Sequence, residues 1–319
     1  MIRTAECVTP KHPDKICDRI SDSILDVCLE QDPNSRVAIE TAGGHGHIHI
    51  TGEITTNADI GPIKNIVRRV YGGQIDVTTK VVKQSNFIAQ GVDTGGAGDQ
   101  GIMVGYACDE NDEYIPHEYY HARTLAKLIY GFFPYDGKTQ VTLNHGAITS
   151  IVASFQSTPS EALDQIIVEY MSYNVDNVRI HTNPAGDWDQ GGFDADAGLT
   201  GRKLVVDNYG PRVPIGGGAY SGKDPSKVDR SAAYMARHIA VNELKDRGLK
   251  ECWVYLSYAI GEKEPLQTTV TDGILQWNIP DKYPVYPNEI IEYLQLKNPI
   301  YYETAQWGAY GNGFRWDND

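Results

Sequence analysis

A glycine-rich run near residue 220 limits the fold more than any other part of this chain. Residues 216–222 read Gly-Gly-Gly-Ala-Tyr-Ser-Gly, and Lys223, Lys227 and Asp229 follow closely. Glycine lets a backbone come close to a ligand, lysine supplies a point charge for phosphate, and aspartate can hold the magnesium that a polyphosphate carries. The run therefore predicts a nucleoside triphosphate site on a loop that leads into a helix.

The same run also fits the start of a P-loop, because residues 217–223 follow the pattern Gly-x-x-x-x-Gly-Lys. A P-loop requires Ser or Thr after the lysine, whereas this chain has Asp224, and Pro211 and Pro214 interrupt the expected leading strand. A P-loop is therefore disfavoured. A solvated Gly/Pro turn is the plainest alternative, and the rest of the chain argues against it.

A second motif, His12-Pro13-Asp14-Lys15-Ile16, opens a helical pattern. Apolar residues then recur at helical spacing, which predicts a helix to about Glu30. Proline suits the first helical turn and aspartate suits the helix dipole there. The motif predicts that its histidine, aspartate and lysine gather at a helix N-terminus, where anions bind. Taken alone, an ordinary capped helix with exposed charges explains the motif better.

Together the two motifs resemble S-adenosylmethionine synthetase (methionine adenosyltransferase), and further segments resemble that family in the same order. Among them are residues 96–101 (Gly-Ala-Gly-Asp-Gln-Gly), 198–203 (Gly-Leu-Thr-Gly-Arg-Lys) and 299–304 (Pro-Ile-Tyr-Tyr-Glu-Thr). The resemblance spans nearly all 319 residues, and runs of this length are hard to obtain by chance. The chain is identified as a member of this family, several tens of residues shorter than its typical members.

The resemblance implies an α+β fold of three similar, intertwined units, each a sheet backed by helices. We expect these units at residues 1–94, 95–188 and 189–319, although no internal repeat is visible in the sequence. Local patterns predict strands near residues 37–40, 47–55, 140–143, 148–155, 177–181, 203–207, 252–260 and 266–271. They predict helices near residues 60–71, 118–130, 159–173, 229–247 and 288–294.

Three local signals refine these boundaries. Thr158-Pro159-Ser160-Glu161 reads as a capping box with proline at the first helical position. Gly131 and Gly248 read as helix ends. Residues 183–200 are polar and rich in glycine and aspartate, and loops this long inside a domain are usually functional or disordered. We therefore predict an active-site loop there.

The resemblance implies a reaction in which the methionine sulfur attacks C5′ of ATP and the whole triphosphate leaves. The triphosphate is then cleaved to pyrophosphate and phosphate. A thioether has no proton to remove, so we expect catalysis by alignment and by neutralisation of the leaving group. His12 is expected to donate to the leaving oxygen. The matching cations are His12, Lys15, Lys138, Arg202, Lys203, Lys223 and Lys227.

The resemblance also assigns the ligands of metals and substrates. Asp14 and Asp229 match the family's magnesium ligands, with two Mg²⁺ expected per site, and Glu40 matches the position for K⁺. The positions for methionine are matched by Glu53, Gln90, Asp99 and Lys227. The positions for ATP are matched by Trp188, which would stack on adenine, Asp196, which would bond the ribose, and Asp136, Ala219 and Ile260.

Composition limits the partners of the chain. A formal net charge of -14, from 28 basic and 42 acidic residues, argues against nucleic acid or an anionic membrane as a partner. Five cysteines without a C-x-x-C pair argue against a disulfide framework and favour the cytoplasm. The family's active site lies between two subunits, so the resemblance implies an obligate homodimer and leaves a tetramer open.

The chain departs from the family pattern at several places. Pro10-Lys11 replaces the usual Glu-Gly, while Asp187 and Ile215 replace the usual arginine and histidine. The segment from Asp93 to Gly96 is shorter than the family's lid. Because lids exclude water and often limit turnover, we expect a more open site that discriminates less against a bulkier S-alkyl homologue of methionine.

Three histidines, His45, His47 and His49, share one face if residues 45–49 form a strand. A polar strand face is the favoured explanation and a metal site the less favoured one. Two alternatives to synthesis also stay open. The chain could be an ATP or triphosphate hydrolase that lost productive methionine binding, or a non-catalytic partner subunit of the same fold.

Overall fold

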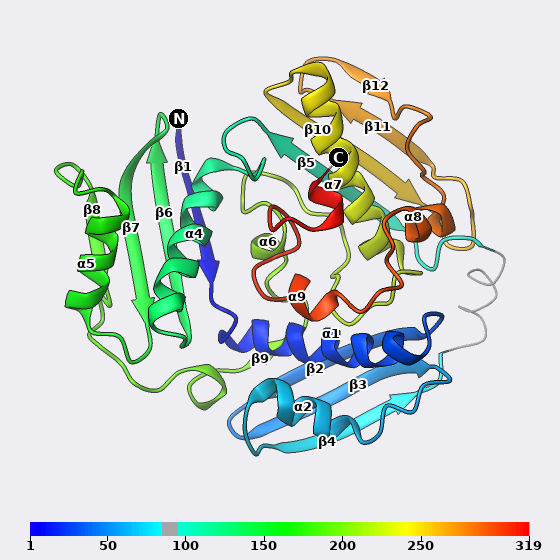
Figure 1. Ribbon diagram of the computed structural model, residues 1–319, viewed down its shortest axis with the longest axis horizontal. Helices are drawn as coiled ribbons and strands as arrows, with labels where there is room; N and C mark the ends of the chain where they lie inside the picture. The colour runs from blue at the N-terminus through cyan, green and yellow to red at the C-terminus, as the bar shows by residue number, and fades with distance from the viewer. Residues whose placement is uncertain (85–94, 319) are drawn as a thin grey trace.

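Three four-stranded sheets, each with helices packed against it, make up the protein in the computed structural model (Figure 1). The structure describes residues 1–84 and 95–318. Apolar side chains alternate along the strands, as in β10 (Glu251–Tyr258), where every second residue is buried. This arrangement confirms the predicted α+β fold of three similar units.

Each sheet combines a run of local strands with one strand from elsewhere in the chain. The first sheet has the order β4(Asp76–Val82)-β3(His47–Thr55)-β2(Arg36–Gly44)-β9(Gly198–Leu199), with helices α1(Pro13–Gln31) and α2(Ile63–Tyr71). The second has the order β1(Ile2–Val8)-β6(Gly137–Asn144)-β7(Ala147–Phe155)-β8(Arg179–Thr182), with α4(His117–Phe132) and α5(Ser160–Tyr170). The third has the order β12(Gln276–Asn278)-β11(Gln267–Thr271)-β10-β5(Gly101–Cys108), with α7(Val228–Arg247) and α8(Pro287–Tyr293).

The first two sheets share one plan. In each, a two-stranded antiparallel hairpin is followed by a helix and then by a strand that pairs in parallel. Both hairpins turn on a His-Gly pair with positive φ at both residues, 51° and 83° at His45 and Gly46, and 49° and 85° at His145 and Gly146. Positive φ at both positions is the mark of a type I′ turn. The repeat is therefore structural, although the sequence does not display it.

The long-range strands intertwine the three units. β1 pairs with β6, β5 pairs with β10, and β9 pairs with β2. The first strand of the chain thus lies in the sheet of residues 137–182 (Figure 1). These pairings bring the end of β1 and the start of α1 close to the segment around β9, which positions the candidate site.

Three local predictions were wrong. Residues 204–207 form a short helix, α6(Leu204–Asp207), and not a strand, because Asp207 N donates to Lys203 O and the Asn208 amide donates to Leu204 O. Helix α5 begins at Ser160 with Pro159 at its N-cap, and the Thr158 hydroxyl donates to Gln156 O, so Thr158 does not cap the helix.

Gly131 does not end α4, which continues to Phe132. Gly248, by contrast, ends α7 in the left-handed conformation with φ 62°, as the sequence predicts.

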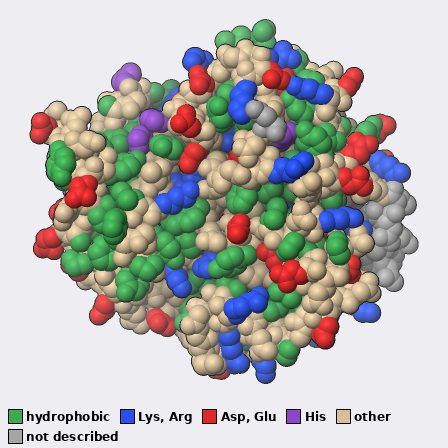
Figure 2. Space-filling view, viewed as in Figure 1, with side chains coloured by type: hydrophobic (Ala, Val, Ile, Leu, Met, Phe, Trp, Pro, Cys, Tyr) green, Lys and Arg blue, Asp and Glu red, His purple; other side chains and the backbone are tan. Residues whose placement is uncertain are grey.

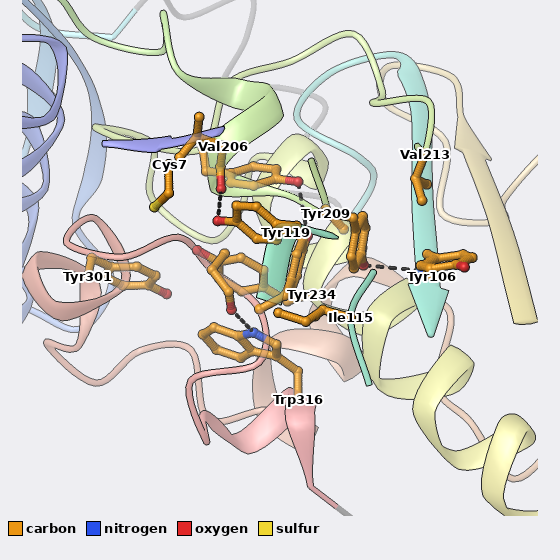
Figure 3. Close-up of a cluster of buried hydrophobic side chains, with 14 of the residues drawn as sticks. Cys7, Tyr106, Ile115, Tyr119, Val206, Tyr209, Val213, Tyr234, Tyr301 and Trp316 are labelled. Carbon is orange, nitrogen blue, oxygen red and sulfur yellow. Dashed lines mark hydrogen bonds between the residues drawn. The ribbon is translucent and has the colours of Figure 1, made fainter. Parts of the chain in front are cut away.

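Buried aromatic rings fill the centre, where elements of all three units meet (Figure 3). The Tyr119 hydroxyl donates to the carbonyl of Val206, and Tyr106 N donates to the Tyr209 hydroxyl at 3.1 Å. The Trp316 indole donates to Ala309 O at 2.7 Å. Buried tyrosine and tryptophan normally find such partners. The first two bonds tie residues 206 and 209 to α4 and β5, and the third folds the C-terminal segment onto itself.

The surface carries charges of both signs. On the face drawn in Figure 2, acidic and basic side chains are interspersed among apolar ones. Within the described part of the chain, no helix combines the length and apolarity needed to cross a bilayer.

Candidate active site

The first group of site residues, here called the α1 cluster, consists of His12, Asp14, Arg202 and Lys203. The His12 ring caps α1, since its Nδ1 accepts from Asp14 N at 3.2 Å. The Asp14 carboxylate contacts Arg202 Nε at 2.9 Å and Lys203 Nζ at 2.5 Å. It also accepts from Leu199 N at 3.0 Å, at the end of β9. The 183–200 segment, which we predict to be an active-site loop, therefore ends against the start of α1.

Burial and neighbouring charges tune this cluster. Burial and the Lys203 ammonium together lower the pKa of His12 to about 4, while Asp14 opposes the change. Burial acts to raise the pKa of Asp14, but hydrogen bonds from Lys203 and Leu199 N hold it below its ordinary value. At neutral pH the histidine is neutral and the aspartate is charged.

The rim of the α1 cluster carries four more predicted residues. Lys138 projects from β6 with a half-exposed side chain, 3.8 Å from Glu6. Asp136 accepts from Gly192 N at 2.9 Å, and burial raises its pKa. Asp196 lies exposed nearby and accepts from Ala197 N. Trp188 is half-buried against Gly191, where an added side chain would collide with its ring.

The second group, here called the glycine-run cluster, consists of Glu40, Lys223 and Asp229. Lys223 Nζ contacts Asp229 Oδ2 at 2.5 Å, at the start of α7. The backbone of Lys223 forms an isolated bridge with Ala38 of β2, which brings it near Glu40. Gly218 packs against the same aspartate, since a Cβ there would lie 2.0 Å from Asp229 Cγ.

Two predicted cations face the interior. The Lys15 side chain is only 1% exposed and contacts Asp18 at 3.0 Å and Asp207 at 2.5 Å. Burial alone would lower the pKa of Lys15, but the two carboxylates raise it. Lys227 is likewise buried against Asp224. The prediction that the lysine of the His-Pro-Asp-Lys motif gathers with His12 and Asp14 on an open anion site is therefore wrong for this chain.

Asp14 and Asp229, the predicted magnesium ligands, belong to different ion-pair clusters, because Asp14 contacts Arg202 and Lys203 whereas Asp229 contacts Lys223. Within residues 1–84 and 95–318, no group of three or more His, Cys, Asp or Glu side chains is placed to hold a metal ion. Mg²⁺ is usually held by one or two carboxylates together with substrate phosphates. One aspartate in each cluster therefore fits the ion, and the single carboxylate of Glu40 offers the oxygen donors that K⁺ requires.

The remaining predicted residues are spread around the glycine run. Glu53 pairs with Ala38 across β2 and β3, and Asp99 accepts from Gln100 N. Ala219 meets Gly201, where a side chain would lie 2.6 Å from its Cβ, and so connects the two clusters. Ile260 is 52% exposed. Gln90 and Asp93 lie outside the described residues.

The histidine triplet is a turn followed by a polar strand face. His45 occupies the turn before β3, so the expectation that the three share one face was wrong. His47 Nε2 and His49 Nδ1 both lie within 3.0 Å of the Thr78 hydroxyl on exposed β4.

A mostly apolar cavity of about 700 Å³ opens beside Arg202 and Lys203. Its apolar wall comes from α6 and the segment after it, and Val205 there is 41% exposed. The main lining residues are Ala5, Leu204, Val205, Val206, Pro211 and Ile215.

Comparison with known proteins decides the family. The N-terminal domain of S-adenosylmethionine synthetase matches residues 1–88, its central domain residues 94–188 and its C-terminal domain residues 190–318. The chain belongs to the S-adenosylmethionine synthetase family. Family membership confirms the predicted fold and the predicted activity, S-adenosylmethionine synthesis by a methionine adenosyltransferase.

Individual relatives cover almost the whole chain. S-adenosylmethionine synthases of Nocardioides sp. and Clostridium tetani are 38% and 40% identical, covering 98% and 97% of this chain and 95% and 93% of their own lengths. An S-adenosylmethionine synthetase structure from Campylobacter jejuni, described as unusual, superposes with a TM-score of 0.89 at 31% identity. It covers 99% of this chain and 96% of its own. The aligned spans of 377 and 366 residues exceed this chain's 319, which fits a shortened family member.

Sequence reasoning missed four aspartates that organise this synthetase site. Asp18, Asp22 and Asp26 follow Asp14 at intervals of four along α1, and each is buried. Asp207 on α6 is buried against Lys15. A signal was present, because aspartates at every fourth position form one helix face and charged residues are almost never buried unless paired.

Proposed function

We propose that this chain transfers the adenosyl group of ATP to the sulfur of L-methionine. The sulfur attacks C5′, the triphosphate departs, and the triphosphate is then hydrolysed to pyrophosphate and phosphate. One observation carries the proposal: Asp14 contacts Arg202 and Lys203, and Asp229 contacts Lys223 beside a glycine run packed against that aspartate.

The cations neutralise the leaving group. Arg202 offers a bidentate fork, whereas Lys203, Lys223 and Lys138 act as point charges. Each of the first three contacts a carboxylate of this chain in the absence of substrate. Because a polyphosphate carries more negative charge than one carboxylate, these side chains are drawn to the triphosphate when it binds. Lys15 supports α1 from inside the protein and does not act as a direct phosphate ligand.

His12 donates a hydrogen bond to the oxygen that leaves C5′. Its Nδ1 accepts from Asp14 N, so the proton of the neutral ring is carried by Nε2. Its low pKa keeps the ring neutral at physiological pH before substrate binds. As negative charge develops on the leaving oxygen, the Nε2–H bond to it strengthens, and this stabilises the transition state.

Asp14 and Asp229 are the residues that would hold two Mg²⁺ ions, and Glu40 the one that would hold K⁺. Bound Mg²⁺ supplies charge neutralisation on the polyphosphate oxygens. Trp188 stacks on adenine, Asp196 bonds the ribose, and Asp136, Ala219 and Ile260 contribute to the nucleotide pocket. Glu53, Asp99 and Gln90 receive methionine. Lys227 lies behind them, held by Asp224.

We further propose that the functional unit is a homodimer with shared sites, and two such dimers could assemble into a tetramer. The two proposed metal ligands, Asp14 and Asp229, belong to different clusters of ion pairs, and a site shared between two subunits would let each chain supply one of them. Val205 in the wall of the cavity beside Lys203 is 41% exposed, and Ile102, which lines a small neighbouring pocket that also contacts Ile215, is 42% exposed. A second copy would cover that surface and join the clusters. The five free, buried cysteines suit the proposed cytoplasmic location.

The test follows S-adenosylmethionine and phosphate together by mass spectrometry, using purified chain with ATP, methionine, Mg²⁺ and K⁺. The proposal requires both products in equal amounts. Phosphate released without methionine would support a hydrolase instead. If neither product forms, a non-catalytic partner subunit becomes the better explanation.

A further inference from the structure

The face of α1 that carries Asp14 holds three loops of the protein by their backbone amides. Asp14 accepts from Leu199 N, Asp18 from Gly201 N at 2.8 Å, and Asp22 from Gly222 N at 2.7 Å. Asp26 accepts from Tyr301 N and Tyr302 N at 3.0 and 2.7 Å. The proposed reaction uses only the first of these aspartates. The other three aspartates contact neither substrate nor metal in that proposal.

Asp22 differs from its neighbours because it also binds a cation of α7. Arg230 Nη1 and Nη2 contact Asp22 Oδ1 and Oδ2 at 2.8 and 2.7 Å, which is the bidentate geometry of a guanidinium–carboxylate pair. The two side chains are 1% and 0% exposed. The guanidinium also lies 4.4 Å from the Tyr301 ring centroid. Both oxygens of Asp22 are therefore committed, and the pair is shielded from water.

This pair holds the backbone on both sides of Lys223. Asp22 binds Gly222 N directly, and Arg230 Nη1 donates to Lys223 O at 2.9 Å. Gly222 has φ 80°, and a Cβ there would lie 2.0 Å from Ile39 O, so the chain has little freedom at this point. Arg230 directly follows Asp229 at the start of α7. One buried ion pair thus fixes both Lys223 and Asp229.

We infer that Asp22 is a positioning residue for catalysis: through Gly222 and Arg230 it sets the placement of the Lys223 ammonium against Asp229. The inference rests on the proposed function, in which Lys223 neutralises triphosphate and Asp229 holds Mg²⁺. A cation displaced by a fraction of an ångström stabilises a developing charge poorly. Asp22 therefore acts on the leaving group without contacting it.

The test compares Asp22→Asn with Asp26→Asn, a matched change on the same helix face that contacts neither Lys223 nor Asp229. We expect Asp22→Asn to lower kcat by at least about tenfold while the KM for methionine stays within about twofold, because the Lys223 ammonium is displaced relative to Asp229. Asp26→Asn should keep kcat near the wild-type value. Equal kcat values in the two variants would overturn the inference.

A double-mutant cycle separates positioning from general loss of structure. If Asp22 acts through Lys223, adding Asp22→Asn to Lys223→Ala should lower kcat little further, because the positioned group is already absent. Effects that multiply would contradict the inference. Should Asp22→Asn fail to fold, Arg230→Lys keeps the cation but loses the bidentate fork. It should show the same fall in kcat, and an unchanged kcat would refute positioning.

Failure of the inference about Asp22 can be distinguished from failure of the proposed function. A wild-type chain that makes no S-adenosylmethionine refutes the proposed function itself. Binding of magnesium tripolyphosphate then tests the inference alone, with a weaker affinity expected for Asp22→Asn than for Asp26→Asn. Equal tripolyphosphate affinities would overturn it.

Discussion

Single residues of this synthetase act through neighbours far away in sequence. Asp14 joins the first turn of α1 to Arg202 and Lys203, and Asp22 joins α1 to the start of α7. Helix α1 therefore aligns two segments that are distant from it in sequence, because its aspartates bind both of them. Conservative changes at Asp14 and Asp22 should therefore affect catalysis more than changes to the exposed charges around the helix.

Asp26 makes stability depend on pH. Burial raises the pKa of Asp26 to about 7, against an ordinary value of about 3.9 for aspartate. The folded state therefore binds this proton more tightly than the unfolded state. The resulting stabilisation is complete below about pH 4 and is lost as the pH rises through about 7.

Asp26→Asn removes this titration. Thermal unfolding at pH 5 and pH 8 should show that the melting temperature of the variant improves relative to wild type at the higher pH. The assignment of this titration to Asp26 would be contradicted if the difference in melting temperature between variant and wild type were the same at both pH values. It would also be contradicted if that difference favoured the wild type more at pH 8.

At the scale of elements, the glycine run works by leaving room for Asp229. Gly218→Ala would place a Cβ 2.0 Å from Asp229 Cγ, whereas a Cβ at Gly217 would meet nothing within 4 Å. We expect Gly218→Ala to raise the Mg²⁺ concentration needed for half-maximal activity by about tenfold or more, since the displaced carboxylate loses its alignment. Gly217→Ala should change it by less than about threefold. Equal effects in steady-state assays would show that loop flexibility, and not the aspartate, matters.

Local patterns predicted the long elements and missed those that tertiary contacts decide. The apolar period of residues 16–28 correctly predicted α1, and Gly248 correctly predicted the end of α7. Leu204-Val205-Val206 has strand propensity but is helical, because Asp207 must reach the buried Lys15. Similarly, Ser160 at the start of α5 donates its backbone N–H and its hydroxyl to Asp187, 27 residues further along the chain. No local pattern contains that partner.

The candidate site was predicted from motif residues, while its division into two clusters was not. The family resemblance predicted Asp14 and Asp229 together as magnesium ligands. Only the fold reveals that they lie in different clusters. Sequence reasoning also treated every matching lysine as a phosphate ligand. Burial distinguishes Lys203, which lies at an open site, from Lys15, which is enclosed by two carboxylates.

At the scale of the whole molecule, the central claim is that one active site needs both clusters, each from a different subunit. Lys203→Ala damages the α1 cluster and Lys223→Ala damages the glycine-run cluster. Each variant alone should fall below about one hundredth of wild-type activity, because a major neutralising cation is lost. Light scattering at the assay concentration should show a dimer or a larger assembly.

Mixing the two variants under conditions that exchange subunits is the most direct test. In a two-fold dimer with shared sites, each mixed dimer has one site with both substitutions and one with neither. Random mixing should therefore restore about one quarter of wild-type S-adenosylmethionine synthesis. A mixture no more active than the separate variants, although mass spectrometry shows mixed dimers, would mean that each site is built within one chain.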